Sequence, residues 1–385
     1  MVPDTRKLKV ALLTNMIAPH RVPIYSVLAE EFELLILHGG SEANRESSSK
    51  SEKILSGAKV IRAWGWQFRH SPRVNGRIFE ERFLHITPGL LWHLLRFCPD
   101  AIISNEMGFR SSIALAYATL FHKPIWIWWG GTLHTERNID PIRGMIRKAF
   151  RSLGDRWISY GQSSTEYLLS LGVRRERILE SQNCVDERRF TAEAEPAWRF
   201  EPRPVVLHAG RLVELKGLGF LLDAASILQK KGFEFSLVLV GDGPDKNDLQ
   251  KKAYTLGLKN VHFLPAQPQE NMVSVYRSAD IVVFPTMQDV WGVVANEAML
   301  AGVPMLCSKY AGCAQELFAP EQIFTPDDLN DFSQKLGAAI SNGLPKPDTG
   351  RLKTARQLGL EIVEELNRLM VGPHSGNQER PQPVT

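Results

Sequence analysis

Short apolar runs, rich in aliphatic and β-branched residues, alternate with amphipathic stretches along the whole chain. The runs of the first half are KVALLT (9–14), LLILH (34–38), AIISN (101–105), IWIWW (125–129) and RWISYG (156–161). Because most positions in these runs are apolar, they predict strands that are buried on both faces, as in parallel sheets covered by helices.

The second half repeats the pattern. Its apolar runs are VVLHAG (205–210), SLVLVG (236–241), VHFLP (261–265), IVVFP (281–285) and VPMLCS (303–308). Stretches with helical periodicity separate them, for example 218–232 and 269–279. Two such series predict an α/β protein with two doubly wound, Rossmann-like domains.

Composition places the domain boundaries. The stretch 185–204 is charged, contains proline and lacks periodicity, so it marks the seam between a first domain over 1–190 and a second domain over 200–350. An amphipathic helix is expected over 351–370, packing back on the first domain. The remaining residues, 371–385, predict a disordered tail.

Charge and cysteine content narrow the class of protein. The chain has 385 residues, 44% hydrophobic and 23% charged, which is typical of a soluble globular protein with more than one core. Its formal charge of +4 is much smaller than the positive charge typical of nucleic-acid-binding proteins. It fits an anionic small ligand or an anionic membrane surface about equally well. The four cysteines form no C-x-x-C pair, which predicts reduced, buried thiols and a cytoplasmic location.

No apolar run reaches the ~18–20 residues of a membrane span, so a membrane contact is expected only from one side, on the inner face.

Candidate ligand-binding residues follow the strands of the second half. Doubly wound sheets bind ligands beyond the carboxyl ends of their strands. After the run 205–209, Gly210 allows a sharp exit, and Arg211 and Lys216 supply two cations suited to a diphosphate; a solvated surface loop is an equal alternative. After 236–240, Gly241 and Asp242 begin a tight turn, which is a weak signal taken alone.

The segment QDVWGVVANEAMLAGVP (288–304) places two acids around a glycine. Gly292 stands where a helix should begin, and free N–H groups at a helix start favour an anion. Asp289 precedes this turn, whereas Glu297 lies beyond the first turn of an apolar helix. Acids near a helix start can simply offset the helix dipole. A buried carboxylate, however, needs hydrogen-bond partners, and sugar or ribose hydroxyls would serve.

Taken in order, GRLVELKG, VGDGP and the text from VHFLP to VPML resemble the retaining glycosyltransferases of the GT-B type, family 4, among the glycosyl transferases group 1. The resemblance covers 205–308 densely and the first half loosely. It implies two Rossmann-like domains facing a cleft, with the acceptor on the first domain and the nucleotide-sugar on the second.

The resemblance also assigns roles to residues. Glu297 matches the acid that holds the ribose, and Arg211 and Lys216 match the cations that hold the diphosphate. Asp289 matches the acid that holds hydroxyls of the transferred sugar; glutamate is usual there, and the side chain is shorter by about 1.5 Å. The donor-binding set is therefore Gly210, Arg211, Lys216, Gly241, Asp242, Asp289, Gly292, Val293, Val294 and Glu297.

The first half offers one candidate catalytic residue. Relatives often place a histidine at the strand end that Gly130 and Gly131 occupy here, and His134 follows shortly after. His134 can take over that role or serve only as a structural loop residue, and the sequence leaves both interpretations open.

Two further stretches of the first half allow a membrane interpretation. The stretch 138–157 has one apolar and one basic face, which is typical of a helix at a membrane surface and also of a Rossmann helix with a solvated face. The stretch 62–83 mixes aromatics with cations and is interpreted as an acceptor-binding or membrane-proximal segment.

The resemblance implies transfer of a sugar (EC 2.4) from a nucleotide-sugar, UDP-linked in preference to GDP-linked, to a saccharide or lipid-linked acceptor hydroxyl with retention. The products would be envelope polysaccharide, lipopolysaccharide or glycolipid. No D-x-D pattern occurs, so we expect neither metal nor other cofactor, and no nucleic-acid partner. The alternatives are a non-catalytic nucleotide-sugar-binding subunit and a sugar-nucleotide epimerase. A dinucleotide oxidoreductase is disfavoured because no G-x-G-x-x-G follows the first strand.

Overall fold

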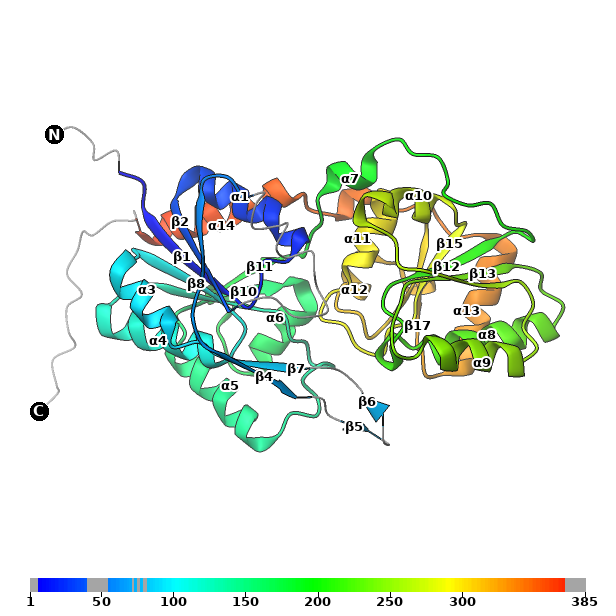
Figure 1. The fold of residues 1–385 in the computed structure, drawn as a ribbon, viewed down its shortest axis with the longest axis horizontal. Coiled ribbons are helices and arrows are strands. Elements are labelled where there is room, and N and C mark those ends of the chain that lie inside the picture. Colours follow the sequence, from blue (N-terminus) through cyan, green and yellow to red (C-terminus); the bar gives the residue numbers. More distant parts are fainter. Residues whose placement is uncertain (1–5, 40–54, 71–72, 75–76, 79–81, 371–385) are drawn as a thin grey trace, which may run out of the picture.

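The chain folds into two α/β domains that lie side by side (Figure 1). The structure is a computed structural model that describes residues 6–39, 55–70, 73–74, 77–78 and 82–370. Each domain is built on a parallel sheet with helices on both faces. The predicted fold class is therefore confirmed.

The first sheet has the strand order β11-β10-β9-β8-β1-β2-β3, and all its pairings are parallel. Its strands are β1 (Lys9–Thr14), β2 (Glu33–His38), β3 (Ala58–Arg62), β8 (Ala101–Asn105), β9 (Ile125–Trp129), β10 (Arg156–Tyr160) and β11 (Ile178–Ser181). Each strand predicted in this half is present. The two edge strands, β3 and β11, were not predicted, because their side chains are partly exposed and their sequences are not continuously apolar.

Two groups of helices cover this sheet. One face carries α1 (Val22–Glu31) and α14 (Ala355–Met370). The other carries α3 (Gly89–Phe97), α4 (Phe109–Phe121), α5 (Pro141–Leu153) and α6 (Gly161–Ser170). Two small antiparallel pairs stand apart from the sheet, β4 (Trp66–His70) with β7 (Arg82–Ile86) and β5 (Arg73–Val74) with β6 (Arg77–Ile78).

The second sheet has the order β14-β13-β12-β15-β16-β17. Its strands are β12 (Val205–Ala209), β13 (Ser236–Val240), β14 (Val261–Leu264), β15 (Ile281–Phe284), β16 (Met305–Ser308) and β17 (Ile323–Phe324). Its helices are α7 (Glu187–Thr191), α8 (Leu218–Lys230), α9 (Lys246–Thr255), α10 (Met272–Arg277), α11 (Val293–Leu300), α12 (Ala314–Leu317) and α13 (Leu329–Asn342). The chain reverses its direction of winding at β12, between β13 and β15, and such a switch point opens a crevice at the strand ends.

The segment between the domains is more ordered than its composition indicates. Within 185–204, which lacks periodicity, the short helix α7 packs its Phe190, with no exposed surface, among the side chains of the second domain. A helix of about one turn is too short to leave a periodic signal.

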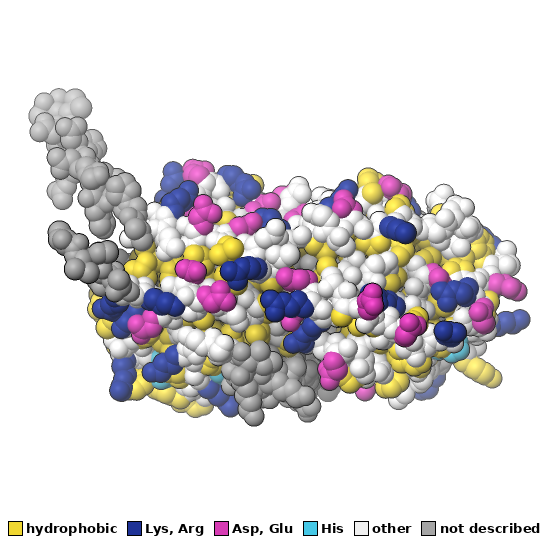
Figure 2. Space-filling model, turned by 90° about the horizontal axis from the view of Figure 1, so that it is seen from above, with side chains coloured by type: hydrophobic (Ala, Val, Ile, Leu, Met, Phe, Trp, Pro, Cys, Tyr) yellow, Lys and Arg dark blue, Asp and Glu magenta, His cyan; other side chains and the backbone are white. Residues whose placement is uncertain are grey.

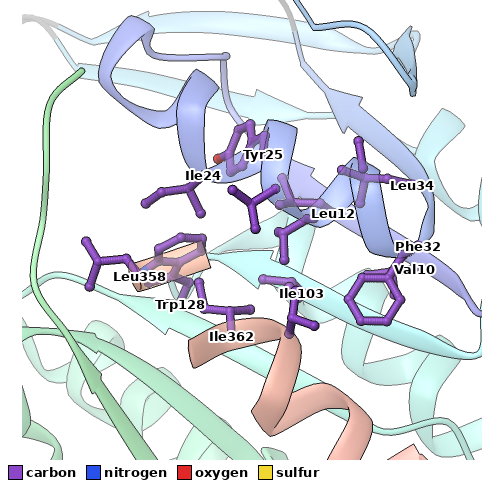
Figure 3. Packing of buried hydrophobic residues seen from close by; sticks show 14 of the residues in the cluster. Val10, Leu12, Ile24, Tyr25, Phe32, Leu34, Ile103, Trp128, Leu358 and Ile362 are labelled. Carbon is purple, nitrogen blue, oxygen red and sulfur yellow. The ribbon is translucent and has the colours of Figure 1, made fainter. Parts of the chain in front are cut away.

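Helix α14 follows the second domain in sequence but lies against α1 of the first (Figure 1). Its Leu358 and Ile362 are buried in the same cluster as Trp128 and Ile103 (Figure 3). The chain therefore crosses between the domains twice, and the first domain is complete only with its last helix. The predicted tail, 371–385, lies outside the described residues.

The cysteines differ in part from expectation. Cys184, Cys307 and Cys313 are buried and free, whereas Cys98 is exposed. Cys98 ends α3 in a left-handed conformation with φ of 50°, so its side chain leaves the apolar side of the helix. Among the described helices, none is long and apolar enough to cross a membrane.

Candidate functional site

A pocket of about 350 Å³ opens at the switch point of the second domain. The loops after β12 and β13 form one wall, and α10 and α11 form the other. Its lining consists of Ala209, Gly210, Arg211, Val240, Gly241, Asp242, Ala266, Gln267, Gln269, Met272, Tyr276, Val294 and Glu297.

The two glycines allow the loops of this wall to touch. The Gly210 N–H donates to the Val240 carbonyl at 2.9 Å. A Cβ atom on Gly241 would lie 1.8 Å from the Gly210 carbonyl oxygen, closer than any side chain permits. Glycine is thus required at Gly241, because the two loops pack backbone against backbone.

Glu297 projects from α11 toward α10. The Tyr276 hydroxyl donates to its carboxylate at 2.6 Å. Burial raises the pKa of Glu297 to about 7, and the hydrogen bond from Tyr276 opposes that shift. This carboxyl group therefore changes charge near neutral pH.

A charged pair lies beside the pocket. The Lys216 ammonium and the Asp289 carboxylate are 2.7 Å apart, and each side chain is 20% exposed. The Lys216 ammonium also lies 5.1 Å from the centre of the Phe284 ring, at the end of β15. Gly292, the N-cap of α11 with φ of 100°, packs on that ring, because a Cβ there would lie 2.5 Å from it. One aromatic ring thus supports both the cation and the helix start.

The predicted donor residues fall into two adjoining groups. The pocket brings together Gly210, Arg211, Gly241, Asp242, Val294 and Glu297. The other four, Lys216, Asp289, Gly292 and Val293, lie on the neighbouring loop and helix start. Arg211 is exposed, and its side chain makes no hydrogen bond or ion pair within the described part of the chain.

His134 contacts the second domain. Its Nε2 lies 2.9 Å from the Met287 carbonyl oxygen, and its ring stacks on Tyr310 with centroids 4.0 Å apart. Burial lowers the pKa of His134, partly offset by the hydrogen bond to Met287. In this position His134 fixes the loop that carries Asp289, because Met287 lies two residues before it.

Other contacts join the domains around the same loop. The Glu316 carboxylate accepts from the Gln162 N–H at 3.0 Å and from the Gln182 side chain at 2.6 Å. The Asn296 side chain, on α11, donates to the Asn183 carbonyl at 3.1 Å. Sequence reasoning missed these residues, since their partners stand more than a hundred positions away.

A buried polar cluster lies at the carboxyl end of the first sheet. Arg21, only 4% exposed, stacks its guanidinium 4.0 Å from the Trp128 ring and 4.5 Å from the Tyr160 ring. Glu106 follows β8 in a left-handed conformation with φ of 67°. Burial raises the pKa of Glu106, and the cations Arg110 and Arg147 oppose the shift. The only sequence signal for Glu106 was its place directly after a predicted strand.

The comparisons bear first on the second domain. The family model described as "Glycosyl transferases group 1" matches residues 191–357. The second half of the chain is thus similar to group 1 glycosyltransferases over these residues. It contains the pocket, the Lys216–Asp289 pair and α11.

Curated relatives are similar to this chain over more than half of its length. The D-inositol 3-phosphate glycosyltransferase of Nocardia farcinica is 30% identical over 242 residues, which are 58% of this chain and 51% of that protein. The sulfoquinovosyl transferase of Arabidopsis thaliana is 26% identical over 282 residues, 66% of this chain and 52% of that protein. The chain thus spans about half the length of the curated relatives it matches.

Solved structures match over both domains. Anabaena HepE, in complex with UDP and glucose, gives a TM-score of 0.63 at 17% identity and covers 93% of this chain and 95% of its own. Sucrose-phosphate synthase from Thermosynechococcus elongatus gives 0.64 at 17% identity, covering 94% and 96%. At this identity the likeness concerns the fold, which is the GT-B arrangement of two Rossmann-like domains.

Proposed function

We propose that the chain is a retaining glycosyltransferase of family 4, which moves a sugar from a nucleotide-sugar to an acceptor hydroxyl. The observation that carries this proposal is the convergence of Glu297, Arg211 and the glycine loops on one pocket, beside the start of α11. An acid suits ribose hydroxyls, and a cation with free N–H groups suits a diphosphate.

The second domain would bind the donor. Glu297, aligned by Tyr276, accepts hydrogen bonds from the ribose. Arg211 and Lys216, with the amides at the start of α11, surround the diphosphate, and Asp289 contacts the transferred sugar. Uridine is preferred over guanosine as the base; Anabaena HepE was solved with UDP, which supports this preference.

The chemical step needs charge stabilisation more than a nucleophile. Retention by double displacement would require a carboxylate beneath the sugar ring. In the proposed same-face substitution, the departing phosphate oxygen takes the acceptor's proton while Arg211 and Lys216 stabilise the diphosphate. NMR of the product should show the donor's anomeric configuration kept; an inverted product would refute this step.

The first domain would bind the acceptor, a saccharide or lipid-linked hydroxyl of envelope polysaccharide, lipopolysaccharide or glycolipid synthesis. The buried cluster of Arg21 and Glu106, at the carboxyl end of its sheet, would support this side of the cleft.

Calorimetric titration with UDP, GDP and ADP tests the donor site. We expect UDP to bind, and Arg211→Ala and Glu297→Ala each to lower turnover at least tenfold, equivalent to about 1.4 kcal/mol of barrier. Arg199→Ala, which alters an exposed arginine of the same domain outside the pocket, is the control. It should leave UDP binding and turnover unchanged.

Other results would redirect the proposal. Binding of UDP without sugar transfer to any acceptor would indicate a non-catalytic subunit, and donor turnover without acceptor would indicate an epimerase. Transfer should survive EDTA; loss on chelation, restored by Mn²⁺, would contradict the expectation of a metal-independent reaction.

A further inference from the structure

Three of the four helices on one face of the first domain, α3, α4 and α5, share an unusual composition. None of them contains aspartate or glutamate. Helix α5 by itself contributes four cations, Arg143, Arg147, Lys148 and Arg151. The helices lie in one layer, because α3 contacts α4 and the Arg147 guanidinium of α5 donates to the Met107 carbonyl before α4 at 2.8 Å.

Helix α5 buries Phe150 but turns several other apolar residues outward. Ile142 and Met145 are each 71% exposed, and Leu153 is 56% exposed. The basic Arg147 points inward instead, where it pairs with Glu136 at 3.1 Å and lies 4.3 Å from the Trp129 ring centre. A surface helix normally buries its apolar face, so these exposed apolar side chains indicate an interaction surface.

Helices α3 and α4 extend the same surface. The one charge of α4, Arg110, is buried, while its Leu120 is 72% exposed. On α3, Leu91 and Trp92 are exposed. The outer face of α3, α4 and α5 is therefore apolar with basic residues and no acid on the helices themselves.

A groove lies at the edge of this face. About 330 Å³ in volume, it is lined by Leu35, Lys59, Ile61, Trp92, His93, Arg96 and Phe97, which combine two cations and a histidine with an apolar floor. Such a lining suits a phosphate group attached to an apolar chain.

The opposite face of the same sheet differs. α1 and α14 carry several glutamates among their charged residues. The view from that side shows acidic and basic side chains interspersed over the surface (Figure 2). Helices α1, α14 and α6 of this domain thus carry glutamates, whereas α3, α4 and α5 carry no acid.

We propose that the outer face of α3, α4 and α5 docks on an anionic lipid bilayer. Exposed aliphatic and tryptophan side chains enter the interface, flanking lysines and arginines contact lipid phosphates, and the groove holds one of them. A second copy of the chain fits less well, because a two-fold contact would oppose cations to cations without acids on these helices to pair them.

Docking by this face brings the cleft close to the bilayer. α5 begins shortly after His134, which contacts the second domain. An acceptor held in the membrane would reach the cleft from this side. The docking itself does not depend on the proposed sugar transfer.

Flotation of the full chain with vesicles tests the proposal. We expect the protein to float with equal parts of phosphatidylcholine and phosphatidylglycerol, at least about tenfold more than with phosphatidylcholine alone, and to be released by salt. Ile142→Glu/Met145→Glu and, separately, Lys148→Glu should each lower binding severalfold. The control Leu360→Glu alters a leucine of α14 that is 42% exposed on the other face, and it should bind like the wild type.

UDP titration and thermal unfolding of each variant establish that it is folded. No flotation of the wild type, or equal flotation of the folded double variant, would overturn the proposal. A wild-type mass of twice the monomer in light scattering, reduced to the monomer by Met145→Glu without any vesicle binding, would assign the face to a second copy.

Discussion

The contact between Glu297 and Tyr276 controls the charge of the candidate donor site. The carboxyl group is covered, so water stabilises its ionised form poorly and its pKa rises from 4.5 to about 7. The Tyr276 hydroxyl stabilises the ionised form by donating a hydrogen bond, so the two effects oppose each other.

UDP affinity should therefore depend on pH. If ionised Glu297 accepts hydrogen bonds from the ribose, affinity rises with pH through about 7. Tyr276→Phe removes a bond that favours the ionised form, so the pKa of Glu297 rises further and the midpoint of the affinity profile moves to higher pH. Calorimetric titration of UDP at several pH values between 5.5 and 8.5 measures this midpoint in the wild type and in Tyr276→Phe.

Tyr254→Phe, which changes a tyrosine 89% exposed on α9, is the matched control and should keep the wild-type midpoint. An unshifted midpoint in Tyr276→Phe would show that this hydroxyl does not set the protonation of Glu297. A profile already flat in the wild type would show that ribose binding does not need the carboxylate.

At the scale of the element, the start of α11 depends on Gly292. Alanine there must adopt φ of 100° and place its Cβ 2.5 Å from the Phe284 ring. Gly302, just after the same helix, also has a positive φ of 80° but has open space around it. Gly292→Ala should therefore destabilise by at least ~1 kcal/mol more than Gly302→Ala.

Chemical denaturation measures the difference, and UDP titration reports the site. Gly292→Ala should also weaken UDP binding, because Phe284 supports Lys216 as well as the helix. Equal destabilisation by the two substitutions would mean that the ring moves aside without cost.

A second prediction at this scale concerns the contribution of helix α14 to the stability of the first domain. Leu358 has no exposed surface and packs in the first domain's core, so Leu358→Ala should cost about 2–5 kcal/mol. Leu360→Ala, on the exposed side of α14, should cost less than about 1 kcal/mol. Hydrogen exchange of β8 and β9 amides should accelerate only in Leu358→Ala; unchanged exchange would show that α14 does not stabilise the first domain.

The sequence predicted those elements whose signal is local. Continuous apolar runs identified the central strands, because both faces of such strands are buried. The edge strands β3, β11 and β17 were not predicted, because they are short or partly exposed. Periodicity also showed that α5 has an apolar and a basic face, but not which one is inward, because Arg147 finds its partners Glu136 and Trp129 only in the folded domain.

The candidate site divides in the same way. Arg211 and Lys216 could be proposed because they follow a predicted strand closely, and Glu297 because it is an acid within an otherwise apolar helix. The Tyr276–Glu297 bond and the stacking of Arg21 on Trp128 could not, since each joins separate elements. His134 was named as a candidate because it follows a predicted strand, but its contacts with Met287 and Tyr310 follow from the placement of the two domains.

For the whole molecule, the described contacts between the domains are largely polar. They include the Glu316 carboxylate with Gln162 and Gln182, and the Ser163 hydroxyl, which donates to the Gly312 carbonyl at 2.9 Å. Polar interfaces between domains resemble transient ones and permit relative motion. In the proposed reaction, such motion would open the cleft to release product and close it for transfer.

Glu316→Ala should shift the molecule toward a more open arrangement. It removes the acceptor for two hydrogen bonds from the first domain, while the pocket, whose lining does not include Glu316, is left intact. We expect a larger radius of gyration in X-ray scattering, unchanged UDP affinity and a severalfold lower turnover with acceptor.

Glu321→Ala, which changes an exposed glutamate of the same domain, is the matched control and should alter none of these three quantities. The three readouts separate the causes: altered UDP affinity would mean that the pocket itself was disturbed. A radius of gyration equal to the wild type would mean that the remaining contacts, including His134 on Met287, hold the domains together without Glu316.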